Sequence, residues 1–169
     1  MNHRLAFLAT AALALGLTIA VPANADTTAK EDRAVAWANS KVGSNDYVFA
    51  CGRFVANAYG EPGLGYPSAL AFHDHLAATK QIHMDTDIPK GALVFSQSPW
   101  DIDGAGHQGH VVIARGDGTF VSGGVDQSSQ LNVAGVGGGS TVQIFKSWNP
   151  APGAEYLGWA PPPATWPGV

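Results

Sequence analysis

Apolar residues recur at helical spacing in three segments of the N-terminal half of the chain. The second segment is typical, because Phe54, Val55 and Ala58 form one stripe along a short amphipathic helix. The third segment follows Ser68, a residue that often caps a helix N-terminus. The pattern predicts helices over 29–42, 51–59 and 68–79.

The C-terminal half changes to short apolar runs separated by turn residues. The run 110–115 is a strong strand, and Gly116-Asp117-Gly118 predicts a hairpin turn into a returning strand over 119–122. Segment 97–109 is expected to be a long loop, and 135–139 a flexible one. Further strands are expected over 92–96, 141–148 and 156–159. Helices followed by an antiparallel meander predict an α+β domain.

The first residues have the pattern of a secretory signal peptide. A short basic start precedes an apolar run over 5–21, and Ala23-Asn24-Ala25 supplies the small residues of a cleavage site. A membrane-spanning helix is the alternative, but the run is shorter than the ~20 residues that a bilayer core requires, and Pro22 interrupts it. We therefore expect a secreted protein with a signal peptide over 1–25, one domain over 26–160 and a Pro/Gly-rich tail over 161–169.

The charge balance narrows the classes of partner. The chain has 13 acidic residues against 9 Lys and Arg, which gives a formal net charge of −4. A mildly acidic chain without a basic patch argues against nucleic-acid binding and gives no reason to expect binding to anionic membranes. We expect a monomer.

Cys51 is the single cysteine of the chain, so it has no intramolecular disulfide partner. In an exported protein such a thiol is a small core residue, half of an intermolecular disulfide, or a nucleophile. Cys51 starts the second predicted helix, where the helix dipole and unpaired N–H groups favour a thiolate and can hold an oxyanion. Gly52 lets a substrate carbonyl approach the backbone. Because the apolar stripe begins at Phe54, the position favours a nucleophile over a packing residue.

A cysteine nucleophile needs a base within hydrogen-bond reach, and His110 opens the strong strand. A surface histidine that caps the strand is the alternative. Zinc binding by His107 and His110, or by His73 and His75, competes with this reading. The chain has no paired Cys and His at zinc-ligand spacing and no His-Glu-x-x-His motif. We therefore expect no metal and no cofactor.

The register of the predicted hairpin decides which group orients His110. If the loop pairs Arg115 with Thr119, Ser122 lies diagonally next to His110 on the same face, and Asp126 shares that face further along. A two-residue turn would turn both away. Ser122 and Asp126 are therefore the candidates, with water or a backbone carbonyl as the alternatives.

Four motifs together resemble the NlpC-type cell-wall cysteine peptidases of the papain-like superfamily. Their order and intervals match the family over roughly residues 33–123, from the tyrosine and nucleophile motif to the hairpin. The motifs are Tyr47-Val48-Phe49-Ala50-Cys51-Gly52-Arg53-Phe54-Val55, Pro89-Lys90-Gly91-Ala92-Leu93-Val94-Phe95, Gly109-His110-Val111-Val112-Ile113 and Gly116-Asp117-Gly118. The resemblance implies a papain-like fold, with N-terminal helices packed on a central antiparallel sheet.

The resemblance also implies hydrolysis of an amide bond in peptidoglycan stem peptides, with Cys51 attacking and His110 accepting its proton. Tyr47 would lie near the nucleophile as a substrate or oxyanion contact. In the long loop, Trp100 is a candidate ligand platform or core residue. Asp101 or Asp103 could meet a stem-peptide amino group, and the alternative is that both are solvated loop acids. The related CHAP amidases share the Cys and His pair, so a sugar-to-peptide bond is an equal candidate.

The chain departs from the family pattern around the nucleophile. Ala50 and Gly52-Arg53 stand where the family usually has Asp before the cysteine and Ser-Gly after it, and Ser122 replaces a histidine or another polar ring or amide. These departures motivate the alternative function, a catalytically weak or inactive relative that binds a cell-wall fragment or a protein partner.

Overall fold

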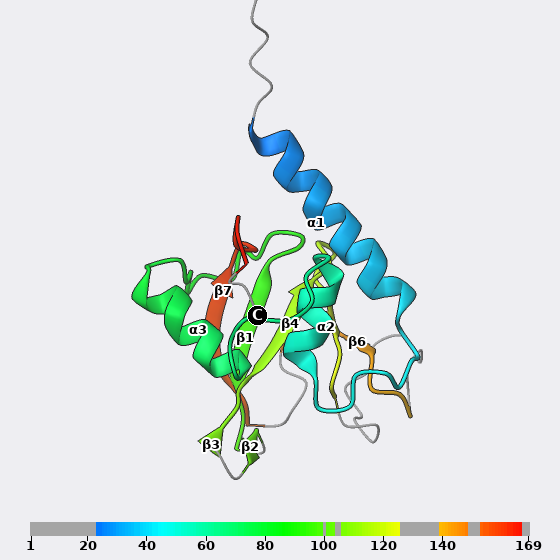
Figure 1. Ribbon diagram of the computed structural model, residues 1–169, viewed down its shortest axis with the longest axis vertical. Coiled ribbons are helices and arrows are strands. Elements are labelled where there is room, and N and C mark those ends of the chain that lie inside the picture. Colours follow the sequence, from blue (N-terminus) through cyan, green and yellow to red (C-terminus); the bar gives the residue numbers. More distant parts are fainter. Residues whose placement is uncertain (1–22, 100, 104–105, 126–138, 149–152, 167–169) are drawn as a thin grey trace, which may run out of the picture.

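Within the part of the chain that the structure describes, three helices and a five-stranded antiparallel sheet make up the main body (Figure 1). The structure, a computed structural model, describes residues 23–99, 101–103, 106–125, 139–148 and 153–166. The helices are α1 (Ala23–Ser40), α2 (Cys51–Ala58) and α3 (Ala69–Ala78). The strands are β1 (Leu93–Gln97), β2 (Ile102–Asp103), β3 (Gly106–His107), β4 (His110–Ala114), β5 (Phe120–Ser122), β6 (Gln143–Phe145) and β7 (Glu155–Ala160). The predicted α+β class is confirmed.

The main sheet has the strand order β6-β5-β4-β1-β7, and each neighbouring pair is antiparallel. The β4–β5 hairpin has the register that a three-residue loop requires. The Arg115 N–H donates to the Thr119 carbonyl at 2.9 Å, and Ile113 pairs with Val121. This register was one of two alternatives left open by the sequence, and it is the one that puts Ser122 and His110 on the same face.

The two faces of the sheet are covered differently. Side chains alternate along each strand, so Val111 and Ile113 of β4 point toward the helices while Val112 and Ala114 point the other way. The helices pack against the first face, with α2 over β4 and α3 over β1 (Figure 1). The opposite face is packed with Trp159 and with partly buried aromatic residues of the C-terminal segments. Both faces are therefore buried, which explains why the central strands are continuously apolar.

Several predicted boundaries differ from the structure. The first helix begins at Ala23, before the expected start at 29. The strand expected over 141–148 is limited to Gln143–Phe145. The loop expected over 97–109 contains the small β2–β3 ribbon, in which Ile102 pairs with His107. Ser68 caps α3 as predicted, because its hydroxyl accepts the Ala71 N–H at 3.0 Å.

The C-terminal tail is part of the packed domain, contrary to the predicted boundary at residue 160. Trp166 is buried, and its ring packs against Tyr59 and Phe72 with centroids 5.6 Å and 5.8 Å away. The composition of the tail suggested a segment outside the core, but one large aromatic side chain buries enough apolar surface to hold it there.

The N-terminal apolar run lies outside the described residues, and so the signal peptide stays a prediction. No helix within the described part of the chain is both long and apolar enough to cross a bilayer.

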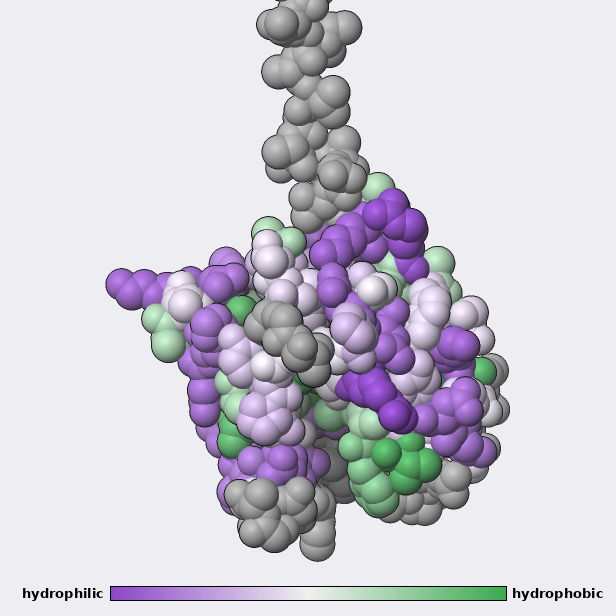
Figure 2. Space-filling view, viewed as in Figure 1, coloured by the Kyte–Doolittle hydropathy of each residue, from purple (hydrophilic) through white to green (hydrophobic). Residues whose placement is uncertain are grey.

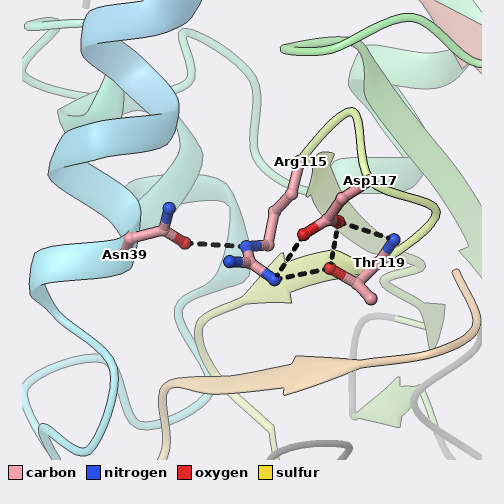
Figure 3. A network of polar contacts seen from close by, with 4 residues as sticks. All are labelled: Asn39, Arg115, Asp117 and Thr119. Atoms are coloured by element: carbon pink, nitrogen blue, oxygen red, sulfur yellow. Dashed lines mark hydrogen bonds and ion pairs between the residues drawn. The ribbon is translucent and has the colours of Figure 1, made fainter.

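A polar network ties α1 to the β4–β5 turn (Figure 3). The Arg115 guanidinium donates to the Asn39 side-chain oxygen at 2.9 Å and to the Thr119 hydroxyl at 2.6 Å. It also forms an ion pair with Asp117 at 3.1 Å. Hydrogen bonds from Thr119 are the main cause of a lowered pKa at Asp117, so this carboxylate keeps its charge to a lower pH than an ordinary aspartate does.

We expect Arg115→Met to lower the free energy of unfolding by about 1–3 kcal/mol, because it removes charge-assisted, partly buried hydrogen bonds and keeps the aliphatic stem. Urea unfolding of both proteins measures the difference. Lys90→Met is the matched control, since it breaks the exposed Lys90–Asp32 ion pair, which also holds α1. That variant should lose no more than about 1 kcal/mol. Equal losses in the two variants would mean that the Arg115 network stabilises the fold no more than an exposed ion pair does.

Candidate active site

Cys51 is the first residue of α2, and the local backbone explains why the helix begins there. Phe49 has a left-handed conformation with φ of +49°, and Ala50 follows with φ of −127°, so neither continues a helix. The first helical hydrogen bond of α2 runs from Phe54 N–H to the Ala50 carbonyl at 2.9 Å. The N–H groups of the three residues between them therefore have no partner within the helix. The thiol thus lies at the positive end of α2.

The apolar face of α2 anchors this helix end against the sheet. Phe54 and Val55 are fully buried, and the Phe54 ring packs edge-on against Tyr47 and at a tilt against Trp37. Gly52 is the position where the resemblance led us to expect a serine. Any side chain there would press on Leu64, whose nearest atom lies 2.9 Å from an added Cβ.

His110 begins β4, opposite Ser96 of β1. The segment before it is held by the start of α3, because the Leu70 N–H donates to the Gln108 carbonyl at 2.8 Å. Gly109 has φ of +65°, and a Cβ there would lie 3.0 Å from the Leu70 nitrogen. Gly109, directly before the histidine, therefore has to be a glycine, because it has a positive φ and packs against the start of α3. The position of the imidazole is thus fixed by β4 and α3 rather than by a free loop.

The Cys51 thiol and the His110 imidazole lie close enough together for each to shift the pKa of the other, through its charge and through a side-chain interaction. Burial acts to raise the pKa of Cys51. The charge of His110, its hydrogen bond and hydrogen bonds from the backbone at Val111 and Gly52 outweigh burial, so the pKa lies below that of an ordinary thiol. The Cys51 residue is nevertheless partly exposed.

The same contact acts on the imidazole in the opposite direction. Burial acts to lower the pKa of His110, but the charge and hydrogen bond of Cys51, and then the charge of Asp101, raise the pKa above its usual value. A lowered thiol pKa beside a raised imidazole pKa favours proton transfer from sulfur to nitrogen. Both shifts move the equilibrium toward the thiolate–imidazolium form, in which sulfur is a nucleophile.

Ser122 lies on the other side of the imidazole. His110 Nε2 and Ser122 Oγ are 2.6 Å apart, and Ser122 is completely buried. The Ser122 hydroxyl donates to the Gly123 carbonyl at 3.2 Å, which leaves Oγ to accept the Nε2–H of His110. Because Nε2 is hydrogen-bonded to Ser122, Nδ1 is the ring nitrogen left to interact with Cys51. Ser122 is thus placed to fix both the ring orientation and the tautomer.

The other predicted site residues have different surroundings. Tyr47 is buried, and its hydroxyl accepts a hydrogen bond from Asn57 at 3.1 Å. Asn57 lies in the last turn of α2, so this bond ties the Tyr47 hydroxyl to the helix that carries Cys51. Trp100 and Asp126 lie outside the described residues. The substrate contacts of Tyr47 and Trp100 stay predictions.

Asp101 lies close enough to His110 for its charge to raise the pKa of the imidazole. Its carboxylate accepts the Ser98 N–H at 2.9 Å, and its carbonyl accepts the Gln108 N–H at 2.7 Å. Asp101 thereby braces the loop that leads into β4. The sequence suggested a substrate contact for this residue and gave no signal for the electrostatic contact with His110.

The histidines considered for zinc are used elsewhere or lie at the surface. His73 contacts the Leu157 carbonyl and Asp74, each at 3.0 Å, and His75 packs against the Tyr66 ring. His107 is exposed on β3. Within the described ranges, no three His, Cys, Asp or Glu side chains are grouped as metal ligands.

Two apolar side chains protrude next to the thiol in sequence. Phe49 is 91% exposed and Val48 is 54% exposed. Figure 2 shows apolar surface at the lower edge of this face, where the segment leading into α2 runs in Figure 1. A bulky residue in the left-handed region costs about 1–2 kcal/mol, and here that cost is not offset by burial.

We expect Phe49→Asn to raise the free energy of unfolding by about 0.5–1 kcal/mol, because Asn tolerates the left-handed conformation. Thermal or urea unfolding measures the change. Val48→Asn is the control, because Val48 is exposed but is not among the residues with positive φ. Stabilisation of both variants, or of neither, would mean that the backbone conformation is not the cause.

Comparisons with known proteins give no relative for this chain. No model of a protein family matches it, and no characterised protein or solved structure matches it at a significant level.

Proposed function

We propose that this protein is a secreted cysteine hydrolase that cleaves an amide bond, with Cys51 as nucleophile and His110 as general acid and base. The observation that carries the proposal is the approach of the thiol at the start of α2 to the imidazole at the start of β4, which is itself held by Ser122 at 2.6 Å. A nucleophile, a base in contact with it and a third group that orients the base are the parts that acyl transfer by a thiol requires.

In this mechanism the Cys51 thiolate attacks the amide carbonyl carbon, and the electron pair of the C=O bond moves to oxygen. In this proposal the N–H groups at the start of α2 stabilise the oxyanion. Collapse of the intermediate breaks the C–N bond, and the amine leaves with the proton of His110 Nδ1. A thioester and a neutral imidazole remain.

Water completes the cycle. His110 Nδ1 takes a proton from water as the oxygen attacks the thioester carbonyl, and collapse of the second intermediate expels the Cys51 thiolate. The carboxylic acid product leaves, and the thiolate–imidazolium pair is restored. Ser122 keeps its hydrogen bond to Nε2 throughout, so Nδ1 is the nitrogen that exchanges protons in both halves of the reaction.

The proposed substrate and the proposed papain-like fold both come from the resemblance to NlpC-type peptidases. A helix that begins with the cysteine and a strand that begins with the histidine, in that order along an α+β chain, support this fold. We therefore propose peptidoglycan stem peptides as the substrate class. Secretion, which the N-terminal pattern predicts, would deliver the enzyme to the cell wall.

Incubation of the purified protein with isolated peptidoglycan sacculi tests the proposal. Wild type should release soluble fragments, and Cys51→Ala should release none above the level without protein. Mass spectrometry distinguishes an endopeptidase, which shortens stem peptides, from an amidase, which frees whole stems from the glycan. Binding of both proteins to the sacculi without release would favour the alternative, a non-catalytic wall-binding protein.

A further inference from the structure

The end of β5 and the two glycines that follow it lie close to the candidate site. Ser122 is the last residue of β5 and still pairs with Gln143 of β6. The described pairing of β4 and β5 ends at Ile113 and Val121, so the next residues no longer follow the edge of β4. We call Ser122, Gly123 and Gly124 the β5 strap. It passes against the first turn of α2, and each of its residues contacts a part of the site.

Gly124 touches the backbone at the start of α2. A Cβ added to Gly124 would lie 2.7 Å from the Ala50 nitrogen and 2.7 Å from the Cys51 nitrogen. Real Cβ atoms do not approach backbone nitrogens so closely, and backbone cannot move aside as a flexible side chain can. Gly124 also has φ of +77°, which glycine adopts without strain.

Gly123 touches the side chain that anchors the same helix. An added Cβ would lie 2.5 Å from Cγ and 2.6 Å from Cβ of Phe54. Gly123 is not among the residues with positive φ, so space rather than backbone conformation requires glycine here. The strap therefore sits against both the backbone and the main apolar contact of the first turn of α2.

At its other end the strap holds the imidazole. Ser122 Oγ accepts from His110 Nε2 and donates to the carbonyl of Gly123, which belongs to the strap itself. We infer that the β5 strap is the positioning element of the site, because three consecutive residues fix the imidazole at one end and the helix start that carries the thiol at the other. This inference rests on the proposed function for the roles of Cys51 and His110, and it adds the residues that set their separation.

Gly124→Ala tests the inference against Gly60→Ala. Both glycines have nearly the same conformation, with φ of +77° and +79°, but nothing lies within 4 Å of a Cβ added at Gly60. Gly60 follows the C-terminal end of α2, away from the thiol. The two variants therefore carry the same backbone strain, and only Gly124→Ala pushes on the site.

The readout is the rate of alkylation of Cys51 by iodoacetamide as a function of pH, with thermal unfolding of the same samples. At the pH where half of the wild-type thiol is ionised, Gly124→Ala should react about fivefold more slowly, which corresponds to a pKa about one unit higher. Gly60→Ala should stay within about twofold of wild type and should lose less stability than Gly124→Ala, because its Cβ meets no neighbouring atom. Gly123→Ala, which adds no backbone strain, should resemble Gly124→Ala.

Equal alkylation profiles in wild type and both strap variants would overturn the inference while leaving the proposed function intact. A wild-type profile like that of an unperturbed thiol would instead overturn the proposed function. If both strap variants fail to fold while Gly60→Ala folds, the inference is also overturned, because the contact then supports the fold as a whole rather than the geometry of the pair.

Discussion

His110→Ala is expected to lower the rate of peptidoglycan hydrolysis by about 10²–10⁴-fold, the usual contribution of a general acid and base. The variant loses the proton acceptor of Cys51 and the proton donor for the leaving amine. It also loses the charge that lowers the pKa of the thiol, so burial is left to raise that pKa. The release of soluble fragments from peptidoglycan sacculi, measured over time at one pH, gives the ratio of the wild-type rate to the rate of His110→Ala.

His107→Ala is the matched control for this prediction. His107 lies three residues earlier in the chain, as an exposed residue of β3. We expect its hydrolysis rate to remain within about twofold of wild type, as for surface substitutions away from a site. A loss in His107→Ala equal to that in His110→Ala would contradict the assignment of the base.

Phe54→Ala is expected to lower the free energy of unfolding by about 3–5 kcal/mol, the cost of removing a buried aromatic ring and leaving a cavity. Phe54 is fully buried, packs on Tyr47 and Trp37, and supports Gly123. Urea unfolding measures the loss. Because the β5 strap rests on this ring, the folded variant should also have a slower-reacting Cys51.

Phe49→Ala is the control for this larger loss. It removes the same ring from a position that is 91% exposed, so it should change the free energy of unfolding by less than about 1 kcal/mol. Comparable losses at the two positions would mean that the packing of Phe54 is not what anchors α2.

The periodicity of the chain was sufficient to locate the helices and the hairpin. The short amphipathic stripe of α2 and the apolar run of β4 are local signals, and the turn at Gly116-Asp117-Gly118 limited the register to two alternatives. Features that depend on contacts between distant segments could not be predicted. Trp166 packs on Tyr59 and Phe72, and no local pattern in a Pro/Gly-rich tail indicates which ring it will meet.

In the candidate site, too, some features are indicated by the local sequence and others depend on contacts between distant segments. Cys51 and His110 could be identified because a lone thiol at a helix start and a histidine at a strand start are visible in the sequence. The contact of Ser122 with His110 followed from one of the two registers. The charge of Asp101 on His110 and the tight contact of Gly124 with α2 depend on where loops meet, which residue type and spacing do not reveal.

The pH dependence of the site follows from the directions of its two pKa shifts. The pKa of Cys51 is lowered, so the thiolate is present above that pKa and is lost as the pH falls through it. The pKa of His110 is raised, so the imidazolium is lost as the pH rises through it. The two shifts therefore widen the pH range in which the thiolate and the imidazolium exist together, because one extends it toward acidic pH and the other toward alkaline pH.

The rate of alkylation of Cys51 in the folded wild-type protein, followed from acidic to alkaline pH, tests the pairing of thiol and imidazole most directly. The geometry predicts rapid reaction that persists at mildly acidic pH, with an apparent pKa well below the ordinary thiol value of about 8.5. A rate that rises only at alkaline pH, or a thiol that does not react until the protein unfolds, would contradict it.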